Sequence, residues 1–131
     1  MVGLPGISLF DGMFQGMERV LDLRSIQHTL TAGNISNADT PNYRAKEIPF
    51  EELLAEVMDR SLDGKRVDPE EMVQSTIEEK EPTPWALDGN SVDAEAEAMR
   101  MTTNTLMYNA LSGGMSRRLA MLRFAASDGK S

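Results

Sequence analysis

The chain has 131 residues, 21 of them acidic and 13 basic for a net charge of −8, and it contains no cysteine. This length allows one modest domain with a hydrophobic core, and the lack of cysteine excludes a disulfide framework and a thiolate metal site. The acidic balance argues against nucleic-acid binding, because it repels phosphate backbones. No apolar run approaches the roughly 20 residues of a membrane span, and the N-terminus lacks a secretory signal, so we expect a chain made in soluble form.

The first predicted element is a long helix that begins near Leu9, after an irregular leader at Met1–Ile7 that contains two glycines and a proline. Its apolar residues recur at spacings of three and four, which is typical of a helical stripe. The first stripe consists of Phe10, Phe14, Met17 and Leu21. A second stripe, of Leu23, Ile26 and Leu30, lies nearly opposite at about 100° per residue. We therefore expect this helix to be contacted from more than one side.

A polar turn follows, with the sequence Asn-Ile-Ser-Asn-Ala-Asp-Thr-Pro-Asn-Tyr from Asn34 to Tyr43. Asn and Asp side chains bond nearby backbone groups, and Pro41 cannot continue a helix. We expect Asn34 and Asn37 to satisfy backbone groups where the chain leaves the helix. Ile35 and Tyr43 are expected to pack against the helices.

Beyond the turn, Arg44–Pro49 alternates polar and apolar residues, which predicts a short extended piece. The next segment has apolar residues at i, i+3, i+4, i+7 and i+8, the pattern of a short amphipathic helix. These residues are Phe50, Leu53, Leu54, Val57 and Met58. We expect this helix to lie against the long helices.

The middle of the chain, 59–90, is rich in turn-forming and charged residues and sparse in apolar ones. This composition predicts a loosely ordered insert, in which a small β-hairpin is possible from Thr76 onwards. Trp85 is its predicted anchor, packed on a helix. The sequence thus divides into an N-terminal part, 1–58, the insert, and a C-terminal part, 91–131.

The helical pattern resumes at Val92 and runs to about Ala126, with acidic residues in its first turns and arginines in its last, as the helix dipole favours. Its apolar spacing is heptad-like and is interrupted at Gly113 and Gly114. The residues expected in helix packing here are Met99, Leu106, Leu111, Met115, Leu119 and Leu122. We predict a mainly α-helical fold whose two long terminal helices pair as an antiparallel-type coiled coil.

Residues suited to catalysis are scarce. The chain has one histidine, no serine within a Gly-x-Ser-x-Gly turn and no glycine-rich phosphate loop. Asp88–Asp93 lacks the glycine and glutamate positions of a calcium-binding loop, and we interpret it as a turn followed by a helix cap. We therefore predict no enzyme activity, no cofactor, no metal and no small-molecule ligand.

The segment from Leu30 to Ala45 resembles the N-terminal signature of the flagellar axial family of rod and hook proteins, a pattern like Leu-x-x-x-Asn-Ile-Ala-Asn-Ala-Asp-Thr-Pro-Gly-Tyr-Lys. A second pattern within this family reads Asp-Gly-Asn-x-Val-Asp and then Asn-x-Leu-x-Tyr. It is similar to the Asp-Gly-Asn motif, Leu87 to Asp93, followed by Met99, Asn104, Leu106, Tyr108 and Leu111. Asn42 stands where the family usually has glycine, and asparagine is the other residue that best tolerates a positive φ. The resemblance implies an assembly motif formed by Asn34, Ile35, Asn37, Ala38, Asp39, Thr40, Pro41 and Tyr43.

The resemblance implies a structural subunit of the proximal rod of the bacterial flagellar basal body, which self-assembles in a helical array and transmits motor torque. It also implies a place in the periplasmic part of the flagellum, after export by the flagellar type III system without a cleaved signal peptide. The implied partners are rod proteins of the FlgC, FlgF and FlgG types, the adaptor FliE, the MS ring and the export gate.

A helical-bundle adaptor that is soluble and dimerises through a coiled coil is the alternative interpretation. It predicts a compact folded particle in dilute solution. A rod subunit is instead expected to have terminal helices that become protected only on assembly.

Overall fold

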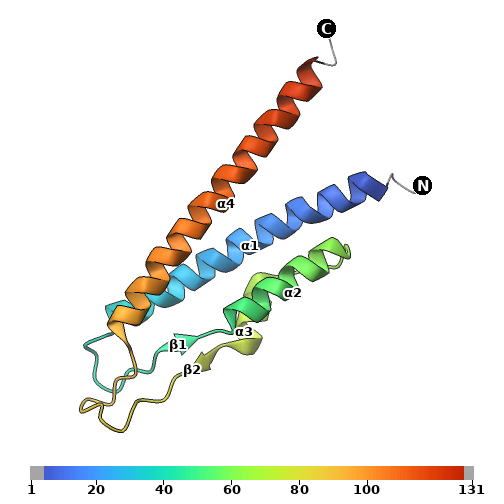
Figure 1. The fold of residues 1–131 in the computed structure, drawn as a ribbon. Helices are drawn as coiled ribbons and strands as arrows, with labels where there is room; N and C mark the ends of the chain where they lie inside the picture. Colours follow the sequence, from blue (N-terminus) through green and yellow to red (C-terminus); the bar gives the residue numbers. More distant parts are fainter. Residues whose placement is uncertain (1–4, 129–131) are drawn as a thin grey trace.

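The computed structural model describes residues 5–128, and over this range the chain is mainly helical. The elements in chain order are α1 (Pro5–Ser36), β1 (Lys46–Glu47), α2 (Phe50–Leu62), α3 (Pro69–Thr76), β2 (Glu78–Glu79) and α4 (Ala94–Asp128). Helices α1 and α4 run antiparallel from one end of the molecule, and α2, α3 and the strands lie on the other side of α1 (Figure 1). None of the described helices is long and apolar enough to cross a membrane.

Helix α1 begins earlier than predicted. Proline fits the first helical turn, because the N–H that it lacks would have no partner there. The predicted irregular leader is therefore wrong for Pro5–Ile7, while residues 1–4 lie outside the described range. Helix α1 packs against α4 on one side and against α2 on the other, so the prediction of contacts from more than one side is confirmed (Figure 1).

The amphipathic helix predicted from Phe50 onwards is confirmed as α2, and it extends to Leu62. Two glycines of α1 let the helices approach closely. A Cβ atom at Gly12 would lie 2.9 Å from the backbone oxygen of Ser61, and one at Gly16 would lie 2.8 Å from the sulfur of Met58. A larger residue at Gly12 would push the backbones of α1 and α2 apart, whereas one at Gly16 would first displace the flexible Met58 side chain.

The hydrophobic core lies between α1, α2 and the segment that includes α3. Its buried residues are Val20, Leu23, Leu53, Val57, Val67 and Val73. Ile26 and Leu30 of α1 and Leu111 of α4 pack against this cluster from its edge. The second predicted stripe of α1 therefore faces the core.

The middle of the chain holds more regular structure than predicted. Asp68 caps α3, because its carboxylate accepts hydrogen bonds from the backbone N–H groups of Glu70 at 3.1 Å and Glu71 at 3.4 Å. Val67 and Val73 fix this helix to the core. The predicted loosely ordered insert is wrong here, because a helix of eight residues with two apolar anchors gives little periodic signal.

The small antiparallel sheet pairs β1 with β2, so that Lys46 lies opposite Glu79 and Glu47 opposite Glu78. The predicted hairpin is wrong, because α2 and α3 separate the two strands in the chain. Trp85 is 79% exposed and does not anchor the segment on a helix. Its loop is bonded to the polar turn instead, at the end of the molecule away from the core.

Helix α4 continues through Gly113 and Gly114, so the prediction of one helix that runs to about Ala126 is confirmed. Each glycine weakens a helix by about 1 kcal/mol relative to alanine, which does not break a helix of this length. Helices α1 and α4 lie together near the end where the chain turns, and they diverge towards the termini (Figure 1). Coiled-coil pairing along their length is not confirmed.

Candidate functional site

The polar turn and the Asp-Gly-Asn motif lie against each other at the end of the molecule where α1 ends and α4 begins (Figure 1). Asn90 makes the central contact. Its side-chain nitrogen lies 2.8 Å from the carbonyl oxygen of Asn37, 3.0 Å from that of Ala38 and 2.8 Å from that of Thr40. An amide nitrogen has two hydrogens, so these three acceptors share two donors. One buried side chain thus holds the backbone of the polar turn.

Asn42 and Gly89 form a second contact between these segments. Both have a positive φ, 61° at Asn42 and 70° at Gly89. The Asn42 N–H donates to the carbonyl oxygen of Asp88 at 2.8 Å. A Cβ atom at position 89 would lie 2.5 Å from the side-chain oxygen of Asn42. The prediction that Asn42 accommodates a positive φ is confirmed, and glycine at 89 leaves room for its side chain.

The Asp-Gly-Asn motif also starts α4. The Asp88 carboxylate accepts a hydrogen bond from the Asn90 N–H at 3.1 Å, and the Asn90 side-chain oxygen accepts one from the Val92 N–H at 2.7 Å. The Asp93 carboxylate accepts from the Ala96 N–H at 3.1 Å, as a helix cap does. The prediction of a turn followed by a helix cap is confirmed.

Asn34 and Ser91 fix the chain between the polar turn and β1. The Asn34 side-chain oxygen accepts from the Lys46 N–H at 2.9 Å, and its amide donates to the Lys46 carbonyl oxygen at 2.9 Å. The Ser91 N–H donates to the Tyr43 carbonyl oxygen at 3.0 Å, and its hydroxyl accepts from the Ala45 N–H at 2.8 Å. Asn34 is buried, so the partners of its side chain are all within the chain.

Asn37 acts over a shorter range. Its amide donates to the Gly33 carbonyl oxygen at 2.8 Å, and its side-chain oxygen accepts from the Thr40 hydroxyl at 3.1 Å. Asn34 and Asn37 thus both bond backbone groups near the helix exit, as predicted, while their role in assembly stays a prediction. Of the other motif residues, Ile35, Ala38 and Tyr43 are half-buried and Asp39, Thr40 and Pro41 are exposed.

The sequence interpretation missed a buried carboxylate of α4. Glu97 is 3% exposed, and its oxygens accept from Arg100 at 2.8 Å and from the Asn34 amide at 3.4 Å. Arg100 also pairs with Glu47 at 3.1 Å, and the Lys80 nitrogen lies 3.9 Å from the Glu47 carboxylate. A buried carboxylate needs such donors to offset its lost hydration. In the sequence, Glu97 looks like an ordinary first-turn acid, because its partners come from other elements.

Asn104 joins the middle of α1 to α4 and was also missed as a site residue. Its amide donates to the carbonyl oxygen of Arg24 at 2.7 Å, and the Arg24 guanidinium donates back to its side-chain oxygen at 3.2 Å. The guanidinium lies 5.1 Å from the ring centroid of Phe50, a cation–π contact with α2. Two signals were available: Asn104 belongs to the second family pattern, and it shares a side of α4 with Leu111 and Met115 at about 100° per residue.

The residues predicted in helix packing divide into two groups. Met115 is buried, and the half-buried members are Phe10, Phe14, Met17, Leu21, Leu30 and Leu111. Met99 is 71% exposed and Leu106 is 67% exposed, so neither packs against α1 in this chain. They lie about 160–180° around the helix from Met115, on the outer side of α4. Leu119 and Leu122 are exposed as well, in the part of α4 that diverges from α1.

A hollow of about 280 Å³ lies beside Asn104 and the Glu97 network. Its ionisable lining is balanced, with three basic and three acidic side chains: Arg24, Lys46, Arg100, Glu47, Glu51 and Glu97. Within residues 5–128, no group of three His, Cys, Asp or Glu side chains could hold a metal ion. The arrangement is that of a structural junction between chain segments.

Three curated relatives from different bacteria share one name. The chain is 31% identical over 129 residues to the flagellar basal body rod protein FlgB of Bacillus subtilis (strain 168), a match that covers 95% of this chain and 100% of that protein. It is 30% identical over 130 residues to FlgB of Escherichia coli (strain K12), covering 86% and 94% of the two chains. It is 32% identical over 111 residues to FlgB of Salmonella typhimurium (strain LT2), covering 75% and 80%.

No family model matches the chain. The relatives confirm the resemblance to flagellar rod proteins that the two motifs indicate. The chain therefore belongs to the family of flagellar basal body rod proteins FlgB.

Proposed function

We propose that the protein is a subunit of the proximal rod, the part of the flagellar drive shaft that transmits motor torque for motility. Its membership in a family of basal body rod proteins supports a structural role in the basal body.

The observation that carries the proposal is the outer side of α4. Met99 and Leu106 are largely exposed there, as are Met121 and Phe124 further along, at 69% and 68%. Monomeric proteins rarely leave apolar side chains uncovered over such a length, and exposed apolar surfaces of this kind mark sites of association. A rod subunit would bury them against neighbouring subunits. Contacts between unlike surfaces do not close, and they generate a helical array.

The proposed partners are copies of the same chain, rod proteins of the FlgC, FlgF and FlgG types, the adaptor FliE, the MS ring and the export gate. The proposed location is the rod within the periplasmic space. Export would use the flagellar type III system without a cleaved signal peptide.

The proposed role of the polar turn is to set the path by which the chain leaves α1, so that the outer side of α4 meets neighbours at a fixed angle. Asn37→Ala and Pro41→Ala are expected to reduce motility and rod formation more than they reduce the amount of protein. His28→Ala is a matched control, because His28 is exposed on α1 and belongs to neither motif. Normal rods in both motif variants would refute this role.

Deletion of the gene, followed by imaging of isolated basal bodies, tests the function itself. We expect basal bodies without a rod, restored by a plasmid copy of the gene. A normal rod in the deletion strain would refute the proposal. The remaining interpretation would then be a soluble adaptor that dimerises through a coiled coil. Such an adaptor is expected to form a compact dimer with protected terminal helices in dilute solution.

A further inference from the structure

The charge of the chain is concentrated in two regions of opposite sign. The acidic lobe, residues 50–81 with α2, α3 and β2, holds eleven acidic and four basic residues, a net charge of −7. Distal α4, residues 112–128, holds three arginines and one aspartate, a net charge of +2. Most of the net charge of −8 therefore belongs to one side of the molecule, and the end of α4 is basic.

No other segment within residues 5–128 covers distal α4. Every residue from 116 to 128 is exposed. At about 100° per residue, the large apolar side chains Leu119, Met121, Leu122 and Phe124 lie on several sides of the helix. None of the ion pairs within residues 5–128 involves the arginines of this region, Arg117, Arg118 and Arg123. A helix with apolar residues on several sides gains stability when other surfaces cover them. Distal α4 thus combines uncovered apolar groups with unpaired cations.

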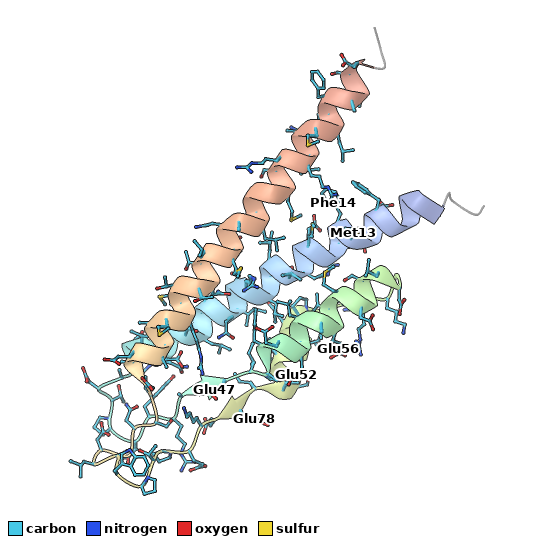
Figure 2. All side chains as sticks on the ribbon, in the orientation of Figure 1. Met13, Phe14, Glu47, Glu52, Glu56 and Glu78 are labelled. Carbon is cyan, nitrogen blue, oxygen red and sulfur yellow. The ribbon has the colours of Figure 1, made fainter. Side chains whose placement is uncertain are left out.

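The outer side of the acidic lobe offers the complementary groups. Glu52 and Glu56 lie along the side of α2 turned away from α1 (Figure 2). Next to them a hollow of about 310 Å³ between α2 and α3 has Glu56, Glu71 and Met72 in its lining. The same lining includes Arg60 and Arg66, of which Arg60 is already paired with Glu56 at 3.0 Å. Glu52 and Glu71 make no ion pair among residues 5–128.

The two regions cannot meet within one chain. Helix α1 lies between α4 and the acidic lobe (Figure 1). Glu52 and Glu56 of the lobe lie on its side away from α1 (Figure 2). Any contact of distal α4 with that outer side must therefore come from another molecule.

We propose that distal α4 of one copy docks on the outer side of the acidic lobe of a second copy. Its arginines pair with Glu52 and Glu71, and its apolar side chains cover the hollow at Met72. Because the contact joins two different surfaces, each pair of copies leaves one surface of each kind free, and the contact repeats along a row. This inference rests on the proposed function and deepens it by assigning the surfaces of self-association.

Charge reversal in the full-length chain tests the contact. The arginine variant carries Arg117→Glu, Arg118→Glu and Arg123→Glu, and the lobe variant carries Glu52→Lys and Glu71→Lys. Each is expected to weaken self-association in sedimentation velocity about 10- to 100-fold, and the wild type is expected to dissociate as salt rises. The chain with all five substitutions is expected to associate again, which a merely structural effect would not produce. Asn109→Glu, at an exposed position of α4 before the distal half, is the matched control and is expected to have no effect.

The chain has no cysteine, so introduced pairs report the contact directly. A mixture of Arg118→Cys and Glu71→Cys proteins is expected to form a disulfide-linked heterodimer, whereas Asn109→Cys with Glu71→Cys is not. Failure of the five-substitution chain to associate, equal cross-linking of both pairs, or no self-association of the wild type would overturn the inference. The deletion strain keeps the two proposals apart: missing rods together with failed charge reversal would refute only the docking surfaces. Normal rods would refute the proposed function whatever the solution experiments show.

Discussion

The side-chain amide of Asn90 donates to the carbonyl oxygen of Asn37 at 2.8 Å, across 53 positions of the sequence. The first of these residues precedes α4, and the second follows α1. Their contact makes the geometry of the helix exit depend on a residue from the last third of the chain. The two motifs are therefore one structural unit, although they are far apart in the sequence.

Asn90→Ala is expected to lower the free energy of unfolding by about 1–3 kcal/mol, because the carbonyl oxygens of Asn37, Ala38 and Thr40 lose their hydrogen bonds to the Asn90 amide. Urea denaturation followed by circular dichroism measures the change. Asn109→Ala, at an exposed position of α4, is the control and is expected to change the stability by less than about 0.5 kcal/mol. Equal effects of the two substitutions would contradict the central place of Asn90.

Asn42 and Gly89 are expected to be energetically coupled. Gly89→Ala is destabilising for two reasons, the positive φ of 70° and the approach of its Cβ atom to the Asn42 side chain. In an Asn42→Gly background the second reason disappears, so the same substitution should cost less, with a coupling of about 0.5–3 kcal/mol. A double-mutant cycle of unfolding free energies measures this coupling. Additive effects would mean that the two side chains do not compete for space.

Glycines at different places in the helices are expected to respond to alanine in opposite directions. Gly12→Ala places a Cβ atom 2.9 Å from the Ser61 backbone oxygen, and overpacking of this kind costs about 1–3 kcal/mol. At Gly113 a Cβ atom meets nothing within 4 Å, so Gly113→Ala is expected to add up to about 1 kcal/mol through helix propensity. Thermal unfolding of the two variants gives the signs. A stabilised Gly12→Ala variant would show that α1 and α2 do not pack closely.

Trp85→Ala is expected to leave the unfolding free energy within about 0.5 kcal/mol of the wild type, because the side chain is largely exposed. Val73→Ala truncates a buried side chain that, like Trp85, lies in the middle of the chain, and it is expected to lower the unfolding free energy by about 1–3 kcal/mol. Trp85 is the only tryptophan, so its fluorescence in the folded wild type should also resemble that of a solvated indole. A strongly destabilised Trp85→Ala variant would restore the interpretation of Trp85 as an anchor.

Local chemistry determined the elements that could be predicted. The i, i+3, i+4 spacing from Phe50 predicted α2. The polar side chains of Asn34 and Asn37 predicted where the chain leaves α1. The positive φ of Asn42 follows from the backbone preference of asparagine itself. Each of these depends on neighbours within a few positions. Asp68 as the cap of α3 carried a local signal as well, but the short helix after it has too few apolar residues to show a period.

The wrong predictions concern contacts between segments that are far apart in the sequence. Helix α4 carries apolar residues on two sides, and periodicity alone does not say whether Leu106 or Met115 faces α1. The sequence likewise could not show that Glu97 would meet Asn34, because the contact spans 63 positions. Trp85 looked like an anchor because tryptophan is usually well buried, and its loop is held by hydrogen bonds of other residues.

The contact of Asn90 with the polar turn also imposes an order of events on a nascent polypeptide. A ribosome delivers the carbonyl groups of residues 37–40 long before it delivers Asn90, and until then these groups can bond only water and the nearby N–H groups of Thr40 and Tyr43. Strand β1 likewise lacks its partner strand until β2, some thirty positions further along the chain, has been made. The angle between α1 and α4 is thus fixed late, when nearly seventy per cent of the polypeptide has been made.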